Sequence, residues 1–456
     1  MPTRRSGRAL LATASLLATG VVALATAAPA QADTASTFAS TVAAIEALPY
    51  QPAYVPAGTD SAFPGAVANT APAQDYTSGS IPGSPDSPAW PPAFQAQTII
   101  STDGATLHGM VALQGGSHPG IVVAHGFNTH ANVSVIRWAA MLAANGWNVA
   151  AFDQRDFSAE QTEDAATPQT FGWKEAQDIL TAGTWLKAHA GVTSVGVVGF
   201  SEGAQNTILA VSHDTNHVFS AALTFSAPAD QDTQVYSTAV PSNCQSPNCT
   251  YPATDALVTL VVPPYTQGDP CVILGNAAQA YSTSPYQILA DESAFHAQTT
   301  VTVPLLNFYS NDDSLVAPFQ ASMMAGYEVG NPLQKTLLVQ HGEHAYFFDR
   351  WWQQSAVLTY FKTLLPTDAS ITTLPTVNQT PGGAALASQL VDLGSPTRAS
   401  ADARVAPYIC DTSQPGPAVQ SAQPDANLSA GEPLALLAIG GAATAVACRR
   451  RRRHAP

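Results

Sequence analysis

A serine lies between Gly199 and Gly203 in the stretch Gly-Phe-Ser-Glu-Gly. The apolar residues 194–200 predict a buried strand before it, and residues 202–213 predict a helix after it. A sharp strand-to-helix turn lifts a serine hydroxyl above the sheet, and such a turn needs small residues on both sides of the serine. Ser201 is therefore a candidate nucleophile, although a serine is also a common N-cap residue of an ordinary helix. An acid and a histidine at suitable positions elsewhere in the chain would favour the nucleophile over the N-cap.

An acid and a base for this serine follow two later strands. Asp312 and Asp313 end an apolar run that precedes a predicted helix, and His341 and His344 follow the last predicted strand. The carboxyl ends of parallel strands meet at one edge of a sheet, so we expect serine, acid and histidine to converge there. In this chain order they form a proton-relay set for attack on an acyl carbon. Two histidines three residues apart on a loop, without further ligands, do not predict a metal site.

Strand and helix patterns alternate along residues 97–365, which hold the dense apolar periodicity of the chain. Repeated strand–helix units with short links predict a mainly parallel sheet that is covered by helices on both faces. The first two strands are expected to form a hairpin around Asp103-Gly104. The predicted strands are 95–102, 105–114, 120–127, 148–156, 194–200, 219–228, 303–313 and 335–340. The predicted helices are 135–147, 174–190, 202–213, 318–330 and 345–365.

Segments with fewer apolar runs flank and interrupt this unit. Residues 229–300 are rich in Pro, Asn, Thr and Cys and lie between two predicted strands, and insertions of this length usually form a lid or substrate-binding cap. A short helix is expected near 37–48 in an otherwise extended arm. The predicted organisation is a signal peptide (1–32), an Ala/Pro/Ser-rich N-terminal arm (33–96), the α/β domain (97–365), a linker-like segment (366–432), an apolar tail (433–448) and a basic cytoplasmic tail (449–456).

Both ends of the chain predict export to the cell surface. Three arginines, an apolar run and the pattern Ala30-Gln-Ala32 indicate a secretory signal peptide that is cleaved after Ala32; an uncleaved anchor is the alternative. A twin-arginine pair leaves the export route open. Residues 433–448 are uncharged, would span about 24 Å as a helix and precede five arginines. This pattern predicts a transmembrane or surface-sorting tail with its basic end inside.

Four of the five cysteines lie in the part of the chain that is predicted to be exported. An even number of cysteines in an oxidising compartment predicts two disulfides, for which three connectivities are possible. The preferred pairing joins Cys244 with Cys249, which share a Pro/Asn/Ser-rich loop, and Cys271 with Cys410. A zinc site is the rival interpretation, but no second close pair of Cys or His accompanies these residues.

Charge is distributed unevenly along the chain. Eight of the 17 Lys and Arg residues lie at the two ends, whereas all 32 Asp and Glu residues lie between them. The nine remaining basic residues leave this central part with a net charge of −23. So much negative charge repels phosphate backbones and argues against nucleic-acid binding.

Over residues 97–365 the sequence resembles the α/β-hydrolases. The matching motifs are HGF (125–127), FDQRD after the fourth strand, the GFSEG turn, SAPAD after the sixth strand, NDDSLVAP and HGEHAYFF. GFSEGAQN and FSAPAD are similar to the esterase-like branch that includes the YheT-type hydrolases. The resemblance implies a mostly parallel sheet flanked by helices with an inserted cap, a Ser-Asp-His triad and no cofactor or metal.

The family pattern also selects among the paired candidates. Its frame for the acid matches Asp313, which is followed by Ser-Leu-Val-Ala-Pro, and leaves Asp312 as a loop cap. Its frame for the base matches His344, which lies between Gly-Glu and Ala-Tyr, with His341 as the alternative.

The resemblance further implies an oxyanion hole made of the backbone N–H groups of Phe127 and Glu202, with His125 shaping the turn before it. Two departures from the pattern stand out. The segment after Asp153 reads QRDFS where many relatives have an arginine followed by glycine, and Glu202 follows the nucleophile where Leu, Met or Gln is commoner.

These observations predict an exported, surface-anchored serine hydrolase that cleaves carboxylic esters through an acyl-enzyme on Ser201. The expected substrate is a small ester or acyl compound, and the C-terminal tail is expected to anchor the chain to membrane or cell wall. A surface peptidase or an acyltransferase with the same triad is the enzymatic alternative, because residues that select the substrate would fall within 229–300. A catalytically inactive hydrolase fold that serves as a binding module is the alternative from another class.

Overall fold

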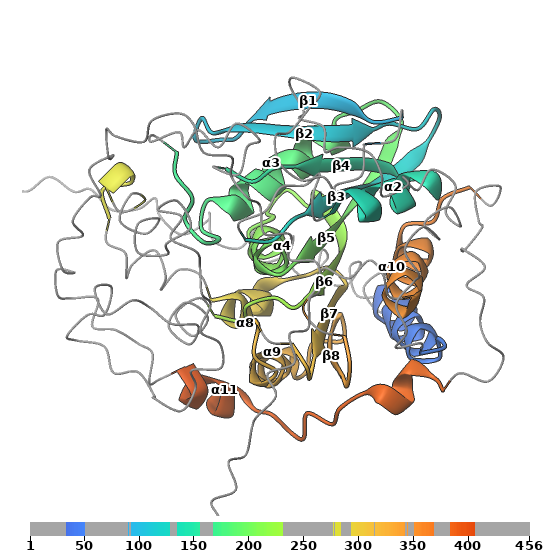
Figure 1. The fold of residues 1–456 in the computed structure, drawn as a ribbon, viewed down its shortest axis with the longest axis vertical. Helices are drawn as coiled ribbons and strands as arrows, with labels where there is room; N and C mark the ends of the chain where they lie inside the picture. The colour runs from blue at the N-terminus through green and yellow to red at the C-terminus, as the bar shows by residue number, and fades with distance from the viewer. Residues whose placement is uncertain are drawn as a thin grey trace, which may run out of the picture.

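The computed structural model describes residues 33–50, 90, 93–127, 135–155, 167–230, 277, 279–283, 293–313, 315–342, 344, 351–368 and 384–405. One eight-stranded sheet crosses the molecule in the order β1-β2-β4-β3-β5-β6-β7-β8 (Figure 1). The strands are β1 (Gln95–Ile100), β2 (Thr106–Ala112), β3 (His118–Ala124), β4 (Asn148–Phe152), β5 (Val192–Phe200), β6 (Phe219–Phe225), β7 (Leu305–Ser310) and β8 (Gln334–Val339).

The predicted mainly parallel sheet is confirmed. β1 and β2 form the expected antiparallel hairpin, β2 is antiparallel to β4, and all pairings from β4 through β3 to β8 are parallel. The apolar runs explain why the central strands lie inside: β3 buries all seven of its residues and β5 buries its last six. Parallel strands covered on both faces show such continuous apolar runs rather than alternation.

Helices cover both faces of the sheet. A helix over 33–46, α2 (Ile136–Ala144) and α10 (Trp351–Leu364) share one apolar cluster with the strands. α3 (Glu175–Lys187), α4 (Glu202–Ser212), α8 (Ala294–Ala297) and α9 (Phe319–Glu328) belong to the cluster on the other face. The remaining described elements are the 3-10 turns η3 (Gln298–Thr300) and η5 (Leu386–Gln389) and the helix α11 (Arg398–Val405), which packs on α9.

Two segments that flank the motif-bearing region pack onto it. The 33–46 helix lies beside α10 (Figure 1) and buries Phe38, Val42 and Ile45 in the first cluster. The chain then pairs with the C-terminal segment, because Pro49 bridges to Ala385. The core of the molecule therefore includes residues on both sides of 97–365.

The sequence predicted an inserted cap over 229–300, between β6 and β7. The structure describes only parts of this region, chiefly 279–283 and 293–300. α8 and η3 pack against α4 and α9 as part of the helical layer, with Phe295 fully buried. Residues 231–276, 278 and 284–292, where the cap was predicted, lie outside the described residues. The same holds for the predicted signal peptide at 1–32 and the tail at 433–456. Within the described part of the chain, no helix combines the length and apolar character that crossing a membrane requires.

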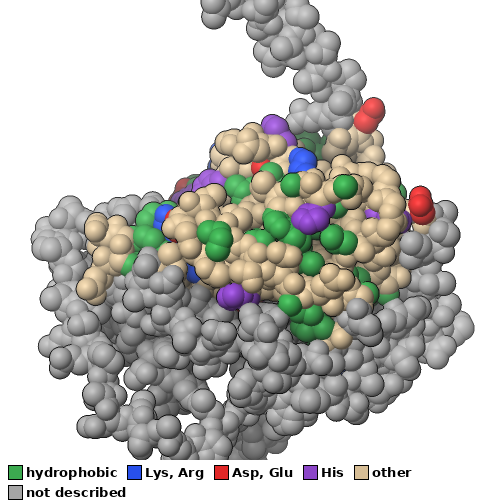
Figure 2. All heavy atoms as spheres, turned by 90° about the horizontal axis from the view of Figure 1, so that it is seen from above, with side chains coloured by type: hydrophobic (Ala, Val, Ile, Leu, Met, Phe, Trp, Pro, Cys, Tyr) green, Lys and Arg blue, Asp and Glu red, His purple; other side chains and the backbone are tan. Residues whose placement is uncertain are grey.

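β1 forms one edge of the sheet and exposes polar and apolar side chains rather than charges. Four of its residues are exposed, and Ile100 retains 59% of its accessible surface. Figure 2 looks down on this side of the molecule and shows few charged side chains among the described residues. The outer strand of the hairpin therefore borders the sheet, while Asp103 in its turn contacts Arg155 after β4.

Shortening Ile45 should destabilise the whole domain. Ile45 is fully buried in the cluster that also holds α10, so Ile45→Ala should lower the free energy of unfolding by about 2–5 kcal/mol through lost burial and a cavity. Denaturant unfolding followed by tryptophan fluorescence measures this loss, with Ala44→Ser on the exposed side of the same helix as the control. An unchanged midpoint in Ile45→Ala would show that the 33–46 helix unfolds separately from the core.

Candidate active site

Ser201 lies at a strained turn between β5 and α4. Its backbone has φ 55° and ψ −125°, in the left-handed half of conformational space that side chains other than glycine rarely occupy. The turn is held by a hydrogen bond from the Ser201 N–H to the carbonyl of Phe225 on the neighbouring strand, at 2.8 Å. Residues kept in such conformations cluster at functional sites, where the surrounding structure stabilises the strain.

The turn leaves no room for side chains at the two glycines. A Cβ on Gly199 would lie 2.2 Å from the Gly203 carbonyl oxygen. A Cβ on Gly203 would lie 2.1 Å from the carbonyl oxygen of His125, at the end of β3. Because each obstacle is backbone, no rotamer change could relieve it. Glycine at both positions lets α4 start directly against β5 and the turn after β3.

A row of aromatic rings supports the serine turn from one face of the sheet. Phe200 and Phe225 stack with ring centroids 5.4 Å apart, and Phe225 and Phe308 stack at 5.1 Å. Trp138 of α2 covers Phe200 at 5.0 Å. The strand ends next to Ser201 are thereby packed rigidly, which keeps the strained turn in place.

The structure brings His344 and Asp313 together. The Nδ1 atom of His344 lies 2.9 Å from Oδ1 and 3.0 Å from Oδ2 of Asp313. Both side chains are buried, and the backbone N–H groups of Leu315 and Val316 donate to Asp313 Oδ1 at 2.8 and 2.9 Å. The carboxylate is therefore fixed and holds the proton of the imidazole on Nδ1, which leaves the lone pair on Nε2.

The neighbouring pair, Asp312 and His341, holds the histidine loop. Asp312 accepts a hydrogen bond from the Gly342 N–H at 3.0 Å and lies 3.3 Å from His341 Nδ1. The His341 side chain is 54% exposed, whereas that of His344 is 7% exposed. Of the two acid–histidine pairs, the buried one is thus the pair that the sequence motifs favour.

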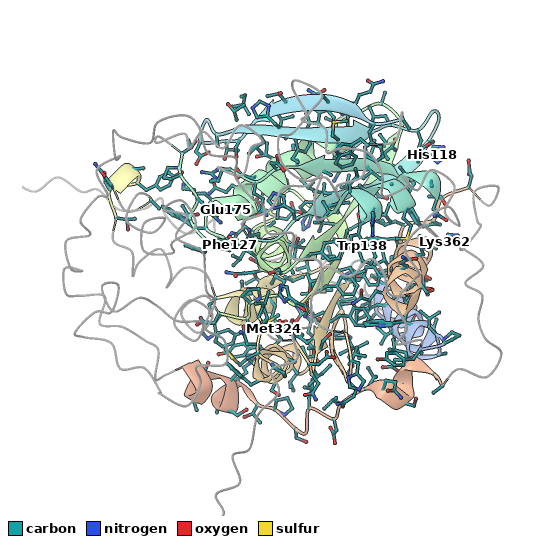
Figure 3. All side chains as sticks on the ribbon, in the orientation of Figure 1. His118, Phe127, Trp138, Glu175, Met324 and Lys362 are labelled. Carbon is teal, nitrogen blue, oxygen red and sulfur yellow. The ribbon has the colours of Figure 1, made fainter. Side chains whose placement is uncertain are left out.

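Phe127 follows β3 at the same edge of the sheet. Figure 3 shows it on the opposite side of the molecule from His118, which begins β3. Its ring stacks on Phe171, with centroids 5.4 Å apart, and Phe171 itself has a positive φ of 57°. The loop after β3 and the strained turn at Phe171 therefore meet next to the start of α4.

Glu202 begins α4 with a buried side chain. Its carboxylate oxygens accept from the Gln169 amide at 3.0 and 3.3 Å. Burial raises the pKa of Glu202 well above its ordinary value of 4.5, nearby Glu175 raises it further, and the Gln169 hydrogen bond offsets only part of this rise. Glu175 is buried as well, and burial also raises its pKa. A carboxyl with a raised pKa thus lies one residue after Ser201.

Arg155 connects the end of β4 with the inserted segment. Its guanidinium donates to both oxygens of Asp178, with Nη2 at 2.7 Å from Oδ1 and Nε at 2.9 Å from Oδ2. Nη1 donates to Asp103 at 2.8 Å and to the hydroxyl of Tyr281 at 2.7 Å. Tyr281 also packs edge-on against Trp173, with centroids 5.4 Å apart. The buried arginine therefore tethers the described part of the insertion to the sheet edge.

Several of the predicted residues cannot be compared with the structure. The disulfide candidates Cys244, Cys249, Cys271 and Cys410 lie outside the described residues. Sequence motifs, in turn, missed Gln154, Asn206 and Gln169, whose side chains pack around the serine turn and the loop after β3. Only their proximity to strand ends and to the serine could have suggested them.

The sheet order, the helices on both faces and the serine turn after β5 define the α/β-hydrolase fold. No family model matches the chain. Over 119 residues the chain is 30% identical to the thiohydrolase aneE of Aspergillus aculeatus, a match that covers 25% of this chain and 36% of that protein. The chain thus spans about a third of the length of this curated relative.

Two solved structures are examples of known folds that are similar to this chain. An esterase of Pyrococcus furiosus matches with a TM-score of 0.43 and 18% identity, over 60% of this chain and 93% of that one. A puromycin-hydrolyzing peptidase of Mycobacterium tuberculosis matches with a TM-score of 0.43 and 14% identity, over 61% of this chain and 40% of that one.

Replacing Glu202 by glutamine should change how stability depends on pH. Below the ordinary pKa of 4.5 the folded and unfolded states both hold the proton, so ionisation of Glu202 does not affect folding. As pH rises above 4.5, the unfolded chain releases the proton while the folded chain keeps it, and this difference lowers wild-type stability until pH passes the raised folded-state pKa. Glu202→Gln cannot ionise and escapes this loss.

The advantage of Glu202→Gln over wild type should therefore grow as pH rises. Thermal unfolding of both proteins from about pH 4 to pH 9 measures it. A difference in midpoint that stays constant over this range, or shrinks as pH rises, would contradict a raised pKa at Glu202.

Proposed function

We propose that this protein is a serine hydrolase that cleaves carboxylic esters through an acyl-enzyme on Ser201. One observation carries the proposal: the buried contact of His344 Nδ1 with Asp313, on the edge where strained Ser201 also lies. An orienting carboxylate, a histidine with its lone pair on Nε2 and a serine on a strained turn are the components of nucleophilic acyl transfer.

In the proposed reaction the Ser201 hydroxyl attacks the acyl carbon of the ester, and its proton passes to Nε2 of His344. Asp313 stabilises the imidazolium that forms. The tetrahedral oxyanion is received by the backbone N–H groups of Phe127 and Glu202, and the N-terminus of α4 favours the negative charge. Collapse of this intermediate expels the alcohol, which takes the proton from His344.

Water completes the cycle. A water molecule attacks the acyl carbon of the acyl-enzyme through its oxygen, and His344 takes a proton from this water molecule. The second tetrahedral intermediate releases the carboxylic acid, and the proton returns to the Ser201 oxygen. The protein ends in its starting state, with one water consumed for each ester cleaved.

The proposed substrate class draws support from the relatives as well as from the site. The curated relative is named a thiohydrolase, and the attack of a serine on a thioester follows the same steps as its attack on an oxygen ester. Esters and thioesters are therefore the first substrates to test. Aminoacyl anilides and alcohol acceptors belong in the same panel, because a peptidase or an acyltransferase would use the same three side chains.

We also propose that the protein acts outside the cell and is attached to its surface. This proposal rests on residues 1–32, which have the composition of a secretory signal, and on the apolar tail 433–448 with its five following arginines. The acidic central part suits an exported, soluble body.

Removing the Ser201 hydroxyl should abolish activity and labelling together. Wild type should hydrolyse nitrophenyl esters and react covalently with a fluorophosphonate probe, whereas Ser201→Ala should lose both, with kcat reduced by about 10⁶-fold. Ester assays and gel fluorescence of the labelled protein provide the measurements, and Ser226→Ala, after β6, serves as the matched serine control. A folded wild type that neither reacts with the probe nor cleaves any ester would favour a binding module instead.

The acid can be identified by comparing Asp313 with its neighbour. Asp313→Asn should lower kcat by about 10⁴-fold, because an amide at this position favours the wrong tautomer of His344. Asp312→Asn keeps an oxygen that can accept from the Gly342 N–H, so its kcat should fall less than about tenfold. The same ester assay serves both variants, and the opposite order of effects would assign the acid to Asp312.

A further inference from the structure

Gln154 bridges three segments at the edge where Ser201 lies. It lies two residues after the end of β4 and is 4% exposed. Its backbone N–H donates to Nε2 of His125 at 2.9 Å, and its side-chain amide donates to the carbonyl of His125 at 2.6 Å. Its amide oxygen accepts a hydrogen bond from the Asn206 side chain, which projects from the second turn of α4. One side chain thus joins the ends of β3 and β4 to the helix that begins after Ser201.

These contacts fix the tautomer of His125. A backbone N–H can only donate, so Nε2 of His125 is the acceptor in its contact with Gln154. The ring proton is therefore on Nδ1, which donates to the carbonyl of Gly126 at 2.8 Å. His125 is fully buried, so its ring stays in this orientation.

The contact at Gly126 also sets the direction of the next amide. A trans peptide unit is planar, and its C=O and N–H point in opposite directions. The carbonyl of Gly126 and the N–H of Phe127 belong to one such unit. With that carbonyl held toward the His125 ring, the N–H of Phe127 must point the opposite way. The carbonyl of the preceding residue is held too, by Gln154, so the loop is constrained at two successive peptide units.

We propose that Gln154 and Asn206 are positioning residues that hold the Phe127 N–H, through His125, in the direction needed to receive the oxyanion. This inference rests on the proposed function. Oxyanion donors stabilise the transition state only if they are oriented before charge develops, and losing one donor reduces kcat by about 10²–10³-fold. A donor that remains but is less well oriented should reduce kcat by a smaller factor.

The test compares two nearly isosteric variants with wild type. Gln154→Met removes both side-chain hydrogen bonds, and Asn206→Leu removes the amide that donates to Gln154 without adding a charge next to the serine turn. Each should lower kcat for a nitrophenyl ester by about 10- to 100-fold and leave KM within about twofold, because the oxyanion forms only after binding. A trifluoromethyl ketone, which forms a tetrahedral adduct with the serine, should bind each variant more weakly by the same factor.

Gln298→Met is the matched control. Gln298 is also a fully buried glutamine whose amide donates to a backbone carbonyl, that of Met324 at 2.7 Å, but it belongs to η3. Its replacement should reduce thermal stability and leave kcat and ketone affinity unchanged. Circular dichroism and the thermal midpoint identify any variant that fails to fold, and the other positioning variant then serves for the comparison.

The outcomes separate this inference from the proposed function. Unchanged kcat in both folded variants, or a fall in kcat without weaker ketone binding, would overturn the positioning role while wild type remains an esterase. A fall in kcat of equal size in Gln298→Met would show that general destabilisation causes the effect, and it would also overturn the positioning role. A wild type without esterase activity or probe labelling would instead contradict the proposed function.

Discussion

The site depends on one close approach of backbone to backbone, where α4 begins against the loop after β3. At Gly203 the space for a side chain is already taken by the carbonyl of His125, and at Gly199 it is taken by the carbonyl of Gly203. Main-chain atoms cannot move aside as side chains can. The serine turn and the loop that ends at Phe127 are therefore fixed relative to each other before any side-chain contact is considered. The strain at Ser201 persists because this packing and the aromatic rings next to it leave no alternative.

Burial acts on Glu202 beside the serine, and ion pairing acts on Arg155 at the same edge of the sheet. An ionised Glu202 would lie one residue from the developing oxyanion and would oppose it, but burial keeps this carboxyl protonated to a higher pH than an exposed one. At the same edge of the sheet, Arg155 is held between Asp103 and Asp178, so its charge is compensated locally. Backbone dipoles at the start of α4 need no reorganisation during the proposed reaction.

The sequence sufficed to predict the elements and their order, because each central strand is a continuous apolar run and each helix has its own periodicity. Strand ends also pointed to Ser201 and to the pairs Asp312/Asp313 and His341/His344, and the family resemblance then favoured Asp313 and His344. The sequence did not reveal the hydrogen bonds of Gln154, whose partners come from separate segments and leave no pattern of spacing. Polar networks of this kind depend on tertiary proximity, which local periodicity does not encode.

A helix near 37–48 was expected and lies over 33–46, but the packing of the C-terminal flanking segment escaped prediction for a different reason. Residues 384–405 contain no aromatic residue and only five Leu and Val residues, and they read as a linker, yet Leu386 is fully buried beside the 33–46 helix. A handful of well-placed contacts is enough to order such a segment when a neighbouring surface already exists. The sequence reports the density of apolar residues, whereas packing depends on whether those few residues meet a partner.

Both flanking segments form hydrogen bonds with the loop that carries His341 and His344, or with the residue just before it. The Tyr50 hydroxyl donates to the carbonyl of His341 at 2.8 Å, and the Gln340 N–H donates to the carbonyl of Gln389 at 2.8 Å. His344 follows within four residues, and the proposed proton relay requires it to stay against Asp313. The motifs thus lie within 97–365, whereas residues that hold them in place also lie before and after this range. The proposed role of His344 requires its loop to be held in place, and here that support comes from both ends of the described chain.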